Sequence, residues 1–208
     1  RMPLYRQLTR LDPDATDARF ANAERRVGRS LYRTACPTCS ACEGIRIPVD
    51  GFRPSKSQRR VRRRWKALGE RLQVHVGPAT WSEEKVALFN RHKRERGLAD
   101  LDEEPMDAVG YAGWLVQSCF ETIEMRYLLD ERLVAVGVLD VGRTALSSVY
   151  FYFDPDPAIA RLSPGVYSTL EEIELCRQTG RAHHYLGLYV SGCDRLNYKA
   201  SYYPHERL

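Results

Sequence analysis

Three cysteines lie close together in the sequence, at a spacing that suits metal ligation. Cys36, Cys39 and Cys42 form a C-x2-C-x2-C pattern within CPTCSACEG. Thiolates at this spacing can bind one zinc ion or an iron–sulfur cluster, and such sites normally use four ligands. The pattern therefore predicts a metal site that takes a fourth ligand from elsewhere, with a loop of three reduced thiols as the alternative.

Positive charge is concentrated in one stretch, from Arg53 to Lys66. RPSKSQRRVRRRWK holds eight of the 32 lysines and arginines and no acidic residue, whereas acidic residues outnumber basic ones over the rest of the chain. A helix surface of one charge sign repels itself unless an anion covers it, and released counterions favour binding to a polyanion. A solvated helix face is the alternative. We expect nucleic-acid contacts from Lys56, Arg59, Arg60, Arg62, Arg63 and Arg64.

Several tyrosines and one lysine stand at the ends of two predicted strands, over residues 145–153 and 183–190. A tyrosine can relay a proton, and a lysine can bind a phosphate or a carboxylate. Each candidate also has a purely structural interpretation: the tyrosines would pack in the interior, Asp154 would be a turn residue, and Lys199 would be a solvated lysine. The candidate catalytic residues are Tyr150, Tyr152, Asp154, Tyr189, Tyr198 and Lys199.

The elements that must position these residues follow from capping signals and hydrophobic periodicity. Four further strands are predicted: over residues 44–48, where Ile45 and Ile47 alternate with Arg46, over 71–77, and over 122–129 and 132–140, which form a hairpin through Asp130-Glu131. Predicted helices run from Asp12 or Asp14 to Arg25, from Ser55 or Ser57 with Val61, Trp65 and Leu68 on one face, over 82–97, within 106–120, and from Ser163 to Gly180.

This order of elements predicts an α+β protein. The three consecutive strands, helix and strand of the second half are typical of an acetyltransferase-like (GNAT) mixed sheet with flanking helices. We place this catalytic domain at residues 78–208 and a smaller, cysteine-containing N-terminal α/β part at residues 1–77.

The usual acyl carrier of that fold lacks its signature here. Acetyltransferases hold the pyrophosphate of coenzyme A on a glycine-rich turn that opens the helix after the third strand. The sequence RLSPGVYSTL keeps Arg161 and Gly165, but Pro164 removes one amide and the second glycine is absent. A tRNA donor would supply an activated ester and would also explain the basic helix.

Composition favours a globular protein of a reducing compartment. Hydrophobic residues make up 43% and charged residues 28% of the 208 residues. No apolar run approaches the roughly 20 residues of a membrane span, and no signal peptide opens the sequence. Scattered single cysteines without a secretory signal are typical of the cytosol. We therefore predict a cytoplasmic protein without a membrane partner.

Three separated motifs carry a family resemblance. YRTACPTCSACEGIRIPVDGFRPSKSQRRVRRRW, SSVYFYFDP and YLGLYVSGCDRLNYKASYYPHE resemble the bacterial aspartate/glutamate leucyltransferases, relatives of the arginyl-tRNA–protein transferases. The resemblance spans most of the chain. Members usually carry an upstream C-P-Y-L-P stretch, which this sequence lacks, and many read S-L-G where Ser163-Pro164-Gly165 stands here.

The resemblance implies an acyltransferase that moves leucine from leucyl-tRNA to the α-amino group of proteins beginning with Asp or Glu and so marks them for degradation. No cofactor is required, because the donor ester is already activated; an iron–sulfur cluster or zinc at the cysteine loop remains open. Three alternatives remain: the same reaction with arginyl-tRNA, a coenzyme A-dependent N-acetyltransferase, and a non-enzymatic module that binds metal and nucleic acid.

Overall fold

The computed structural model describes residues 3–6, 9–100 and 103–208, and within them the strands form a large and a small sheet. The strands are β1 (Leu4–Arg6), β2 (Arg25–Val27), β3 (Ser30–Tyr32), β4 (Glu43–Pro48), β5 (Leu72–Pro78), β6 (Glu121–Leu129), β7 (Arg132–Val141), β8 (Ala145–Phe153), β9 (His183–Tyr189) and β10 (Glu206–Arg207). The helices are α1 (Pro13–Ala21), α2 (Lys56–Lys66), α3 (Glu83–Glu95), α4 (Ala108–Tyr111), α5 (Pro157–Ala160), α6 (Pro164–Gln178) and α7 (Asp194–Asn197), with short helical turns η1 (Gly69–Arg71), η2 (Ala112–Val116) and η3 (Tyr198–Ser201).

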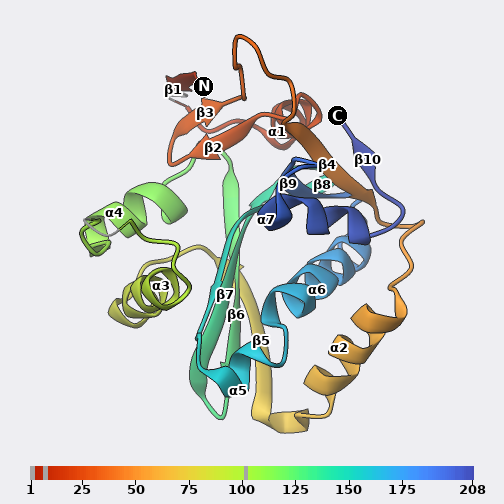
Figure 1. Ribbon diagram of the computed structural model, residues 1–208. Helices are drawn as coiled ribbons and strands as arrows, with labels where there is room; N and C mark the ends of the chain where they lie inside the picture. The colour runs from red at the N-terminus through yellow and green to blue at the C-terminus, as the bar shows by residue number, and fades with distance from the viewer. Residues whose placement is uncertain (1–2, 7–8, 101–102) are drawn as a thin grey trace.

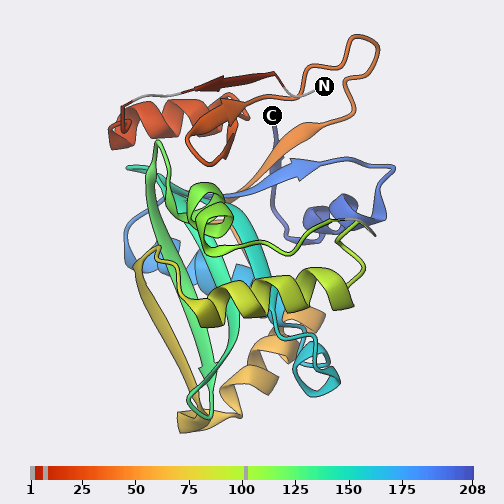
Figure 2. The ribbon, with the colours of Figure 1, turned by 90° about the vertical axis from the view of Figure 1, so that its left-hand side faces the viewer.

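The large sheet has seven strands in the order β10-β4-β9-β8-β7-β6-β5. Helices α6 and α2 lie against one face, and α3 and α4 lie against the other (Figure 1; Figure 2). Strand β7 is buried along almost its whole length, as expected for a central strand covered on both sides. The predicted α+β class, a mixed sheet with flanking helices, is confirmed.

Two apolar layers hold the helices on the sheet. On the α6 side, Trp65 of α2 is fully buried, stacks on Tyr167 of α6 with ring centroids 4.6 Å apart, and donates its Nε1–H to the Leu162 carbonyl at 2.8 Å. On the α3 side, Phe89 packs against Tyr111 of α4. Burial of Val61 and Trp65 confirms two residues of the predicted apolar face, whereas Leu68 follows the end of α2 at Lys66 and is only partly buried against the core.

Local signals place the ends of several elements where the sequence predicts them. Ser55 caps α2 in a capping box with Gln58, so no anion is required to start this basic helix. Asp130 and Glu131 both have positive φ, as a tight two-residue hairpin requires. Within the described ranges, every helix is too short or too polar to cross a bilayer.

The region before the cysteine loop differs from the prediction. Helix α1 ends at Ala21, and Arg25, predicted to be helical, begins β2 of the small sheet β1-β3-β2. Ala23 breaks the helix with a φ of 56°. Buried Arg26 then fixes β2 to the large sheet, because its Nε–H donates to both carboxylate oxygens of Asp140 in β7, at 2.9 and 2.8 Å.

The predicted boundary between residues 77 and 78 falls at the end of β5. Both β4 and β5, which precede it, belong to the same sheet as the strands that follow it. The division into residues 1–77 and 78–208 therefore stays a prediction.

Candidate active site

Strands β8 and β9 run parallel and paired over a short stretch and then diverge. They pair at Ala145 with His183, Leu146 with His184 and Ser147 with Tyr185. Beyond Ser147, β8 pairs only with β7, and β9 pairs with β4 on its other side. Between the diverging halves, backbone groups on the inner edges of β8 and β9 have no strand partner among the described residues. We call this opening the β8/β9 split.

Arg25 occupies the base of the split. It reaches in from β2 and donates from Nη2 to the Ser148 carbonyl of β8 at 2.6 Å. Its guanidinium also lies against Gly187 of β9, where an added Cβ would stand 2.2 Å from Nη1. Gly187 has a φ of 87°, so both backbone conformation and the close approach of Arg25 require glycine. The sequence prediction missed Arg25, because it placed this residue in a helix.

Lys199 brings a second positive charge to the same place. Its Nζ donates to the Leu188 carbonyl of β9 at 2.6 Å. Burial, together with the Arg25 charge, lowers the pKa of Lys199 to about 8. Among the described residues, no carboxylate forms an ion pair with Arg25 or Lys199. The structure thus brings together one predicted and one unpredicted cation without a neutralising acid.

The predicted tyrosines divide between the two sides of the sheet. Tyr189 ends β9 beneath the Arg207 guanidinium, and Tyr198 precedes Lys199 with 54% of its surface exposed. Tyr150 points to the α3 side, with its ring 5.0 Å from that of Trp114, and burial raises its pKa. Tyr189 and Tyr198 therefore adjoin Lys199, while Tyr150 borders a different region.

Tyr152 and Asp154 bind neighbouring side chains that hold the end of β8 in place. Tyr152 is fully buried, its hydroxyl is 2.6 Å from that of Tyr111, and burial raises its pKa far above the usual value. Asp154 is 2% exposed and pairs with Arg91 at 3.0 Å and Arg132 at 2.9 Å. Both side chains fix the end of β8, and we leave them out of the candidate site.

Replacing Tyr152 with phenylalanine tests this assignment. The change leaves the buried Tyr111 hydroxyl without its partner, so we expect a loss of about 1–3 kcal/mol in the free energy of unfolding. Transfer activity of the folded enzyme should stay within twofold of the parent's. Denaturant titration measures the first quantity and initial rates the second; a large drop in rate with unchanged stability would return Tyr152 to the catalytic residues.

A buried polar cluster underlies the split, and sequence reasoning did not identify it as a unit. Glu172 of α6 accepts hydrogen bonds from Ser148 and Ser168 at 2.7 Å each, and its Oε2 is 2.9 Å from His184 Nε2. Ser148 and Glu172 share the same imidazole nitrogen, at 3.3 and 2.9 Å. A Ser-His-acid triad uses the two ring nitrogens separately, so the cluster positions β8, α6 and β9 and does not activate a nucleophile.

The cluster joins opposite charges. Burial opposes ionisation of Glu172, yet its hydrogen bonds to His184, Ser148 and Ser168 lower its pKa overall. Burial also opposes protonation of His184, but its interactions with Cys176 and Glu172 outweigh burial and raise its pKa to about 10. The pair is therefore ionised at neutral pH.

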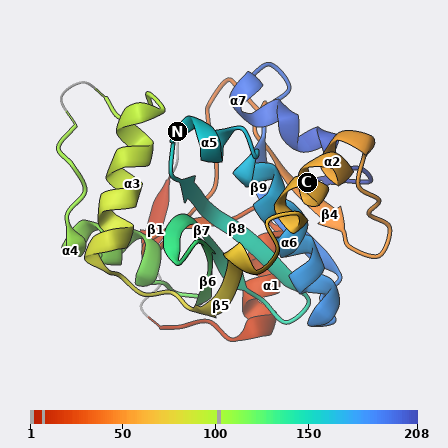
Figure 3. The same ribbon diagram turned by 90° about the horizontal axis from the view of Figure 1, so that it is seen from below.

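The basic helix α2 runs beside α6, the helix that follows β8 (Figure 1; Figure 3). Three of its arginines bind backbone carbonyls: Arg59 binds Pro54, Arg62 binds Leu170 at 3.1 Å, and Arg64 binds Arg161 at 2.7 Å. Arg62 also faces Glu171, at 3.7 Å. Lys56, Arg60 and Arg63 are exposed, and none has a side-chain partner in the described part of the chain. These three form the free basic face of α2.

The start of α6 differs from a phosphate-binding turn. Ser163 holds the N-cap position but has a φ of 58° and makes no side-chain cap. Pro164 follows without an amide hydrogen. The carbonyls of Arg161 and Leu162 just before it already accept from Arg64 and Trp65 of α2. The basic helix therefore packs directly against the turn that opens α6.

The three cysteines of the loop form no disulfide within the described residues. Cys36 and Cys39 are exposed and Cys42 is half-buried. In the ranges that the structure describes, no three histidine, cysteine, aspartate or glutamate side chains are grouped to hold a metal ion. The thiols as placed do not fit a shared metal, and the zinc or iron–sulfur site stays a prediction.

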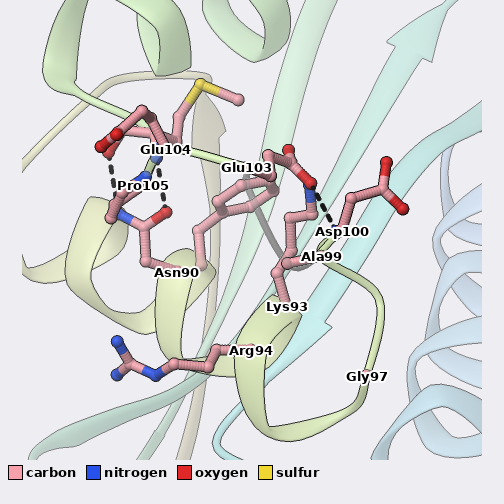
Figure 4. A pocket seen from close by; sticks show the side chains of 11 residues that line it. Asn90, Lys93, Arg94, Gly97, Ala99, Asp100, Glu103, Glu104 and Pro105 are labelled. Carbon is pink, nitrogen blue, oxygen red and sulfur yellow. Dashed lines mark hydrogen bonds and ion pairs between the residues drawn. The ribbon is translucent and has the colours of Figure 1, made fainter.

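A pocket of about 310 Å³ opens between the C-terminal half of α3 and the segment after it (Figure 4). Phe89 and Met106 supply its apolar wall, and Asn90 clamps the Met106 backbone with two hydrogen bonds of 2.8 Å. Lys93 and Glu103 form an ion pair at its rim. Phe89 also packs against Tyr150, with ring centroids 5.5 Å apart, so the pocket lies on the α3 side of the sheet.

Comparison with known proteins gives concordant results. The family model "Arginine-tRNA-protein transferase, C terminus" matches residues 84–208, and the corresponding N-terminus model matches residues 3–60. Proteins named aspartate/glutamate leucyltransferase from Chromohalobacter salexigens and Aeromonas hydrophila are each 37% identical over 184 residues. These matches cover 88% of this chain and 72% and 74% of the relatives.

A solved structure shares the fold at low sequence identity. The crystal structure of FemX superposes with a TM-score of 0.52 at 9% identity, covering 87% of this chain and 61% of that one. The likeness in fold agrees with the family matches at both ends of the chain. The two family-model matches and the 37% identity to the curated relatives show that this chain belongs to the arginine-tRNA-protein transferase family.

Proposed function

We propose that this protein transfers leucine from leucyl-tRNA to the N-terminal α-amino group of proteins that begin with aspartate or glutamate. The observation that carries the proposal is the free basic face of α2 (Lys56, Arg60 and Arg63), which lies alongside α6 and the split sheet in a member of this family. The names of the relatives supply the leucine and the two acceptor residues. Because the reaction consumes aminoacyl-tRNA, its proposed setting is the cytoplasm.

The sheet serves as an acetyltransferase-like scaffold in which the β8/β9 split receives the aminoacyl end of the tRNA. The free edge of β8 offers backbone groups to the aminoacyl ester, and α2 holds phosphates of the tRNA. Aligning an amine with an ester already activated for acyl transfer can lower the barrier by about 7–11 kcal/mol in ideal cases. No covalent enzyme intermediate and no cofactor is needed.

The attacking amine must lose a proton during the reaction. An α-amino group has a pKa of about 7.7–8.0, so a sizeable fraction is neutral at physiological pH. The exposed Tyr198 hydroxyl beside Lys199 can relay the proton that leaves the amine to the ribose oxygen of the departing tRNA, while the Lys199 ammonium stays a hydrogen-bond donor. The tetrahedral oxyanion is stabilised by N–H donors of the split.

A transfer assay tests the proposal directly. Purified protein is incubated with peptides that begin with Asp, Glu or Ala and with tRNA charged with labelled leucine or arginine. We expect label from leucyl-tRNA in the Asp and Glu peptides and none in the Ala peptide.

The other outcomes assign the alternatives. Label from arginyl-tRNA alone would keep the reaction and change the donor. Acetyl transfer from acetyl-coenzyme A without aminoacyl transfer would favour an N-acetyltransferase, against which the Pro164 start of α6 argues. Binding of tRNA without any transfer would favour a non-enzymatic module.

A further inference from the structure

We propose that Arg25 and Lys199 form the binding site for the side-chain carboxylate of the acceptor's first residue. This inference rests on the proposed function and deepens it, because it assigns the acidic specificity to two named side chains. It stands on their joint position at the base of the β8/β9 split.

The two cations come from elements far apart in the sequence. Arg25 comes from β2 of the small sheet and binds the Ser148 carbonyl of β8 at 2.6 Å. Lys199 comes from η3 near the end of the chain and binds the Leu188 carbonyl of β9 at 2.6 Å. Gly187, next to Leu188, lies against the Arg25 guanidinium. Both charges therefore stand along the same short segment of β9.

Donors remain available at both groups. A guanidinium has five N–H donors and an ammonium three, and backbone carbonyls take one of each here. Both side chains are half-buried, and neither forms an ion pair with a carboxylate of the described residues. Two like charges held together in partial burial repel each other, and an arriving carboxylate relieves the repulsion while accepting hydrogen bonds from both.

The covalent structure of the acceptor fits this position. In aspartate and glutamate the side-chain carboxylate and the α-amine are joined through the same Cα, so holding the carboxylate at the base of the split keeps the amine within it. The flexible lysine stem accommodates the extra methylene of glutamate. A tRNA phosphate is the competing anion, but the free basic face of α2 already presents three exposed cations to the phosphate backbone.

The test compares acceptors that differ only in charge. Steady-state transfer is measured with peptides that begin with Asp and with the isosteric, neutral Asn, using the parent, Arg25→Gln, Lys199→Met and the charge-keeping Lys199→Arg. Loss of a charge-assisted hydrogen bond should lower kcat/KM for the Asp peptide about 10- to 100-fold. The preference for Asp over Asn should shrink by the same factor, and the KM for leucyl-tRNA should not change. Lys199→Arg should recover part of the preference.

Binding without tRNA provides a second readout. Fluorescence anisotropy of a labelled Asp peptide should show tighter binding than of its Asn counterpart, and Arg25→Gln and Lys199→Met should remove the difference. Arg71→Gln is the matched control: it removes an exposed cation at the end of η1, bound to Asp130 in the β6–β7 turn, and should keep the difference between the two peptides. Thermal unfolding of each variant verifies folding.

Three outcomes would overturn the inference. The first is an unchanged preference for the Asp over the Asn peptide in folded Arg25 and Lys199 variants, and the second is equal binding of both peptides by the parent. The third is a raised KM for leucyl-tRNA with unchanged kinetic parameters for the acceptor, which would assign the two cations to a tRNA phosphate. A parent that transfers no amino acid to any peptide would instead refute the proposed function, and the binding measurement would still judge the carboxylate site.

Discussion

Reversing two charges on α2, with Arg60→Glu and Arg63→Glu together, is expected to lower affinity for tRNA by about 100-fold at low salt. Both side chains are exposed and have no partner in the described part of the chain, so the change removes phosphate contacts without breaking protein contacts. The plot of log affinity against log salt should become shallower by about 2, since each lost phosphate contact removes about one unit.

The choice of these two arginines follows from the structure. Arg62 and Arg64 bind carbonyls of α6 and the turn before it, so reversing them would also disturb packing. The control is Arg71→Glu with Arg94→Glu, which matches the change in net charge; Arg94 is an exposed residue of α3, on the opposite face of the sheet. Equal salt slopes for the parent and the α2 variant would show that α2 does not contact tRNA.

Replacing Glu172 with glutamine is expected to cost about 3–5 kcal/mol of folding free energy at pH 6, because it leaves the His184 imidazole buried without its carboxylate partner. For a chain of this size the melting temperature should fall by roughly 10 °C. Differential scanning calorimetry measures the shift. Glu174→Gln on the same helix, where Glu174 forms an exposed pair with Arg177 at 3.4 Å, is the matched control and should change little.

The cost should depend on pH in a defined direction. The pKa of His184 is raised from 6.5 to about 10, so its contribution to stability is complete below pH 6.5 and is lost as pH rises through about 10. The pKa of Glu172 is lowered from 4.5, so its contribution is complete above that pH and is lost on acidification through the folded-state pKa. The difference between parent and variant should therefore be larger at pH 6 than at pH 9. Equal differences would show that the pair is neutral.

Much of the fold could be predicted because its signals are local. The Ser55 cap, the Asp130-Glu131 turn and the alternation of Ile45 and Ile47 each involve a few neighbouring residues, and the structure confirms them. Strands β1, β2, β3 and β10 have two or three residues each, too few for a periodic pattern to emerge. Their pairing partners, not their own sequence, make them strands.

The candidate site was predicted only in part for a related reason. Alternation along β8 places Tyr150 and Tyr152 on one face, but the sequence does not say which element covers that face. The structure shows that both pack on the α3 side. Arg25 and Ser148 are 123 residues apart, and no spacing rule connects them. Lys199 could be predicted as a site residue because it is an isolated lysine that follows the end of a predicted strand. Arg25 lies next to other arginines, so nothing in the sequence distinguished it from them.

The position of β4 in the sheet bears on the order in which the molecule assembles. Its two neighbours, β9 and β10, both come from the last 26 residues, although β4 itself begins at Glu43. Closing loops of this length is entropically costly, and pairings so distant in sequence form late in folding. The hairpin of β6 and β7 with β8 can form early, whereas β9, one wall of the split, is held between β8 and β4. The β8/β9 split is therefore among the last regions to form, and a partly folded molecule that holds only β6, β7 and β8 would lack one wall of the site and would be inactive.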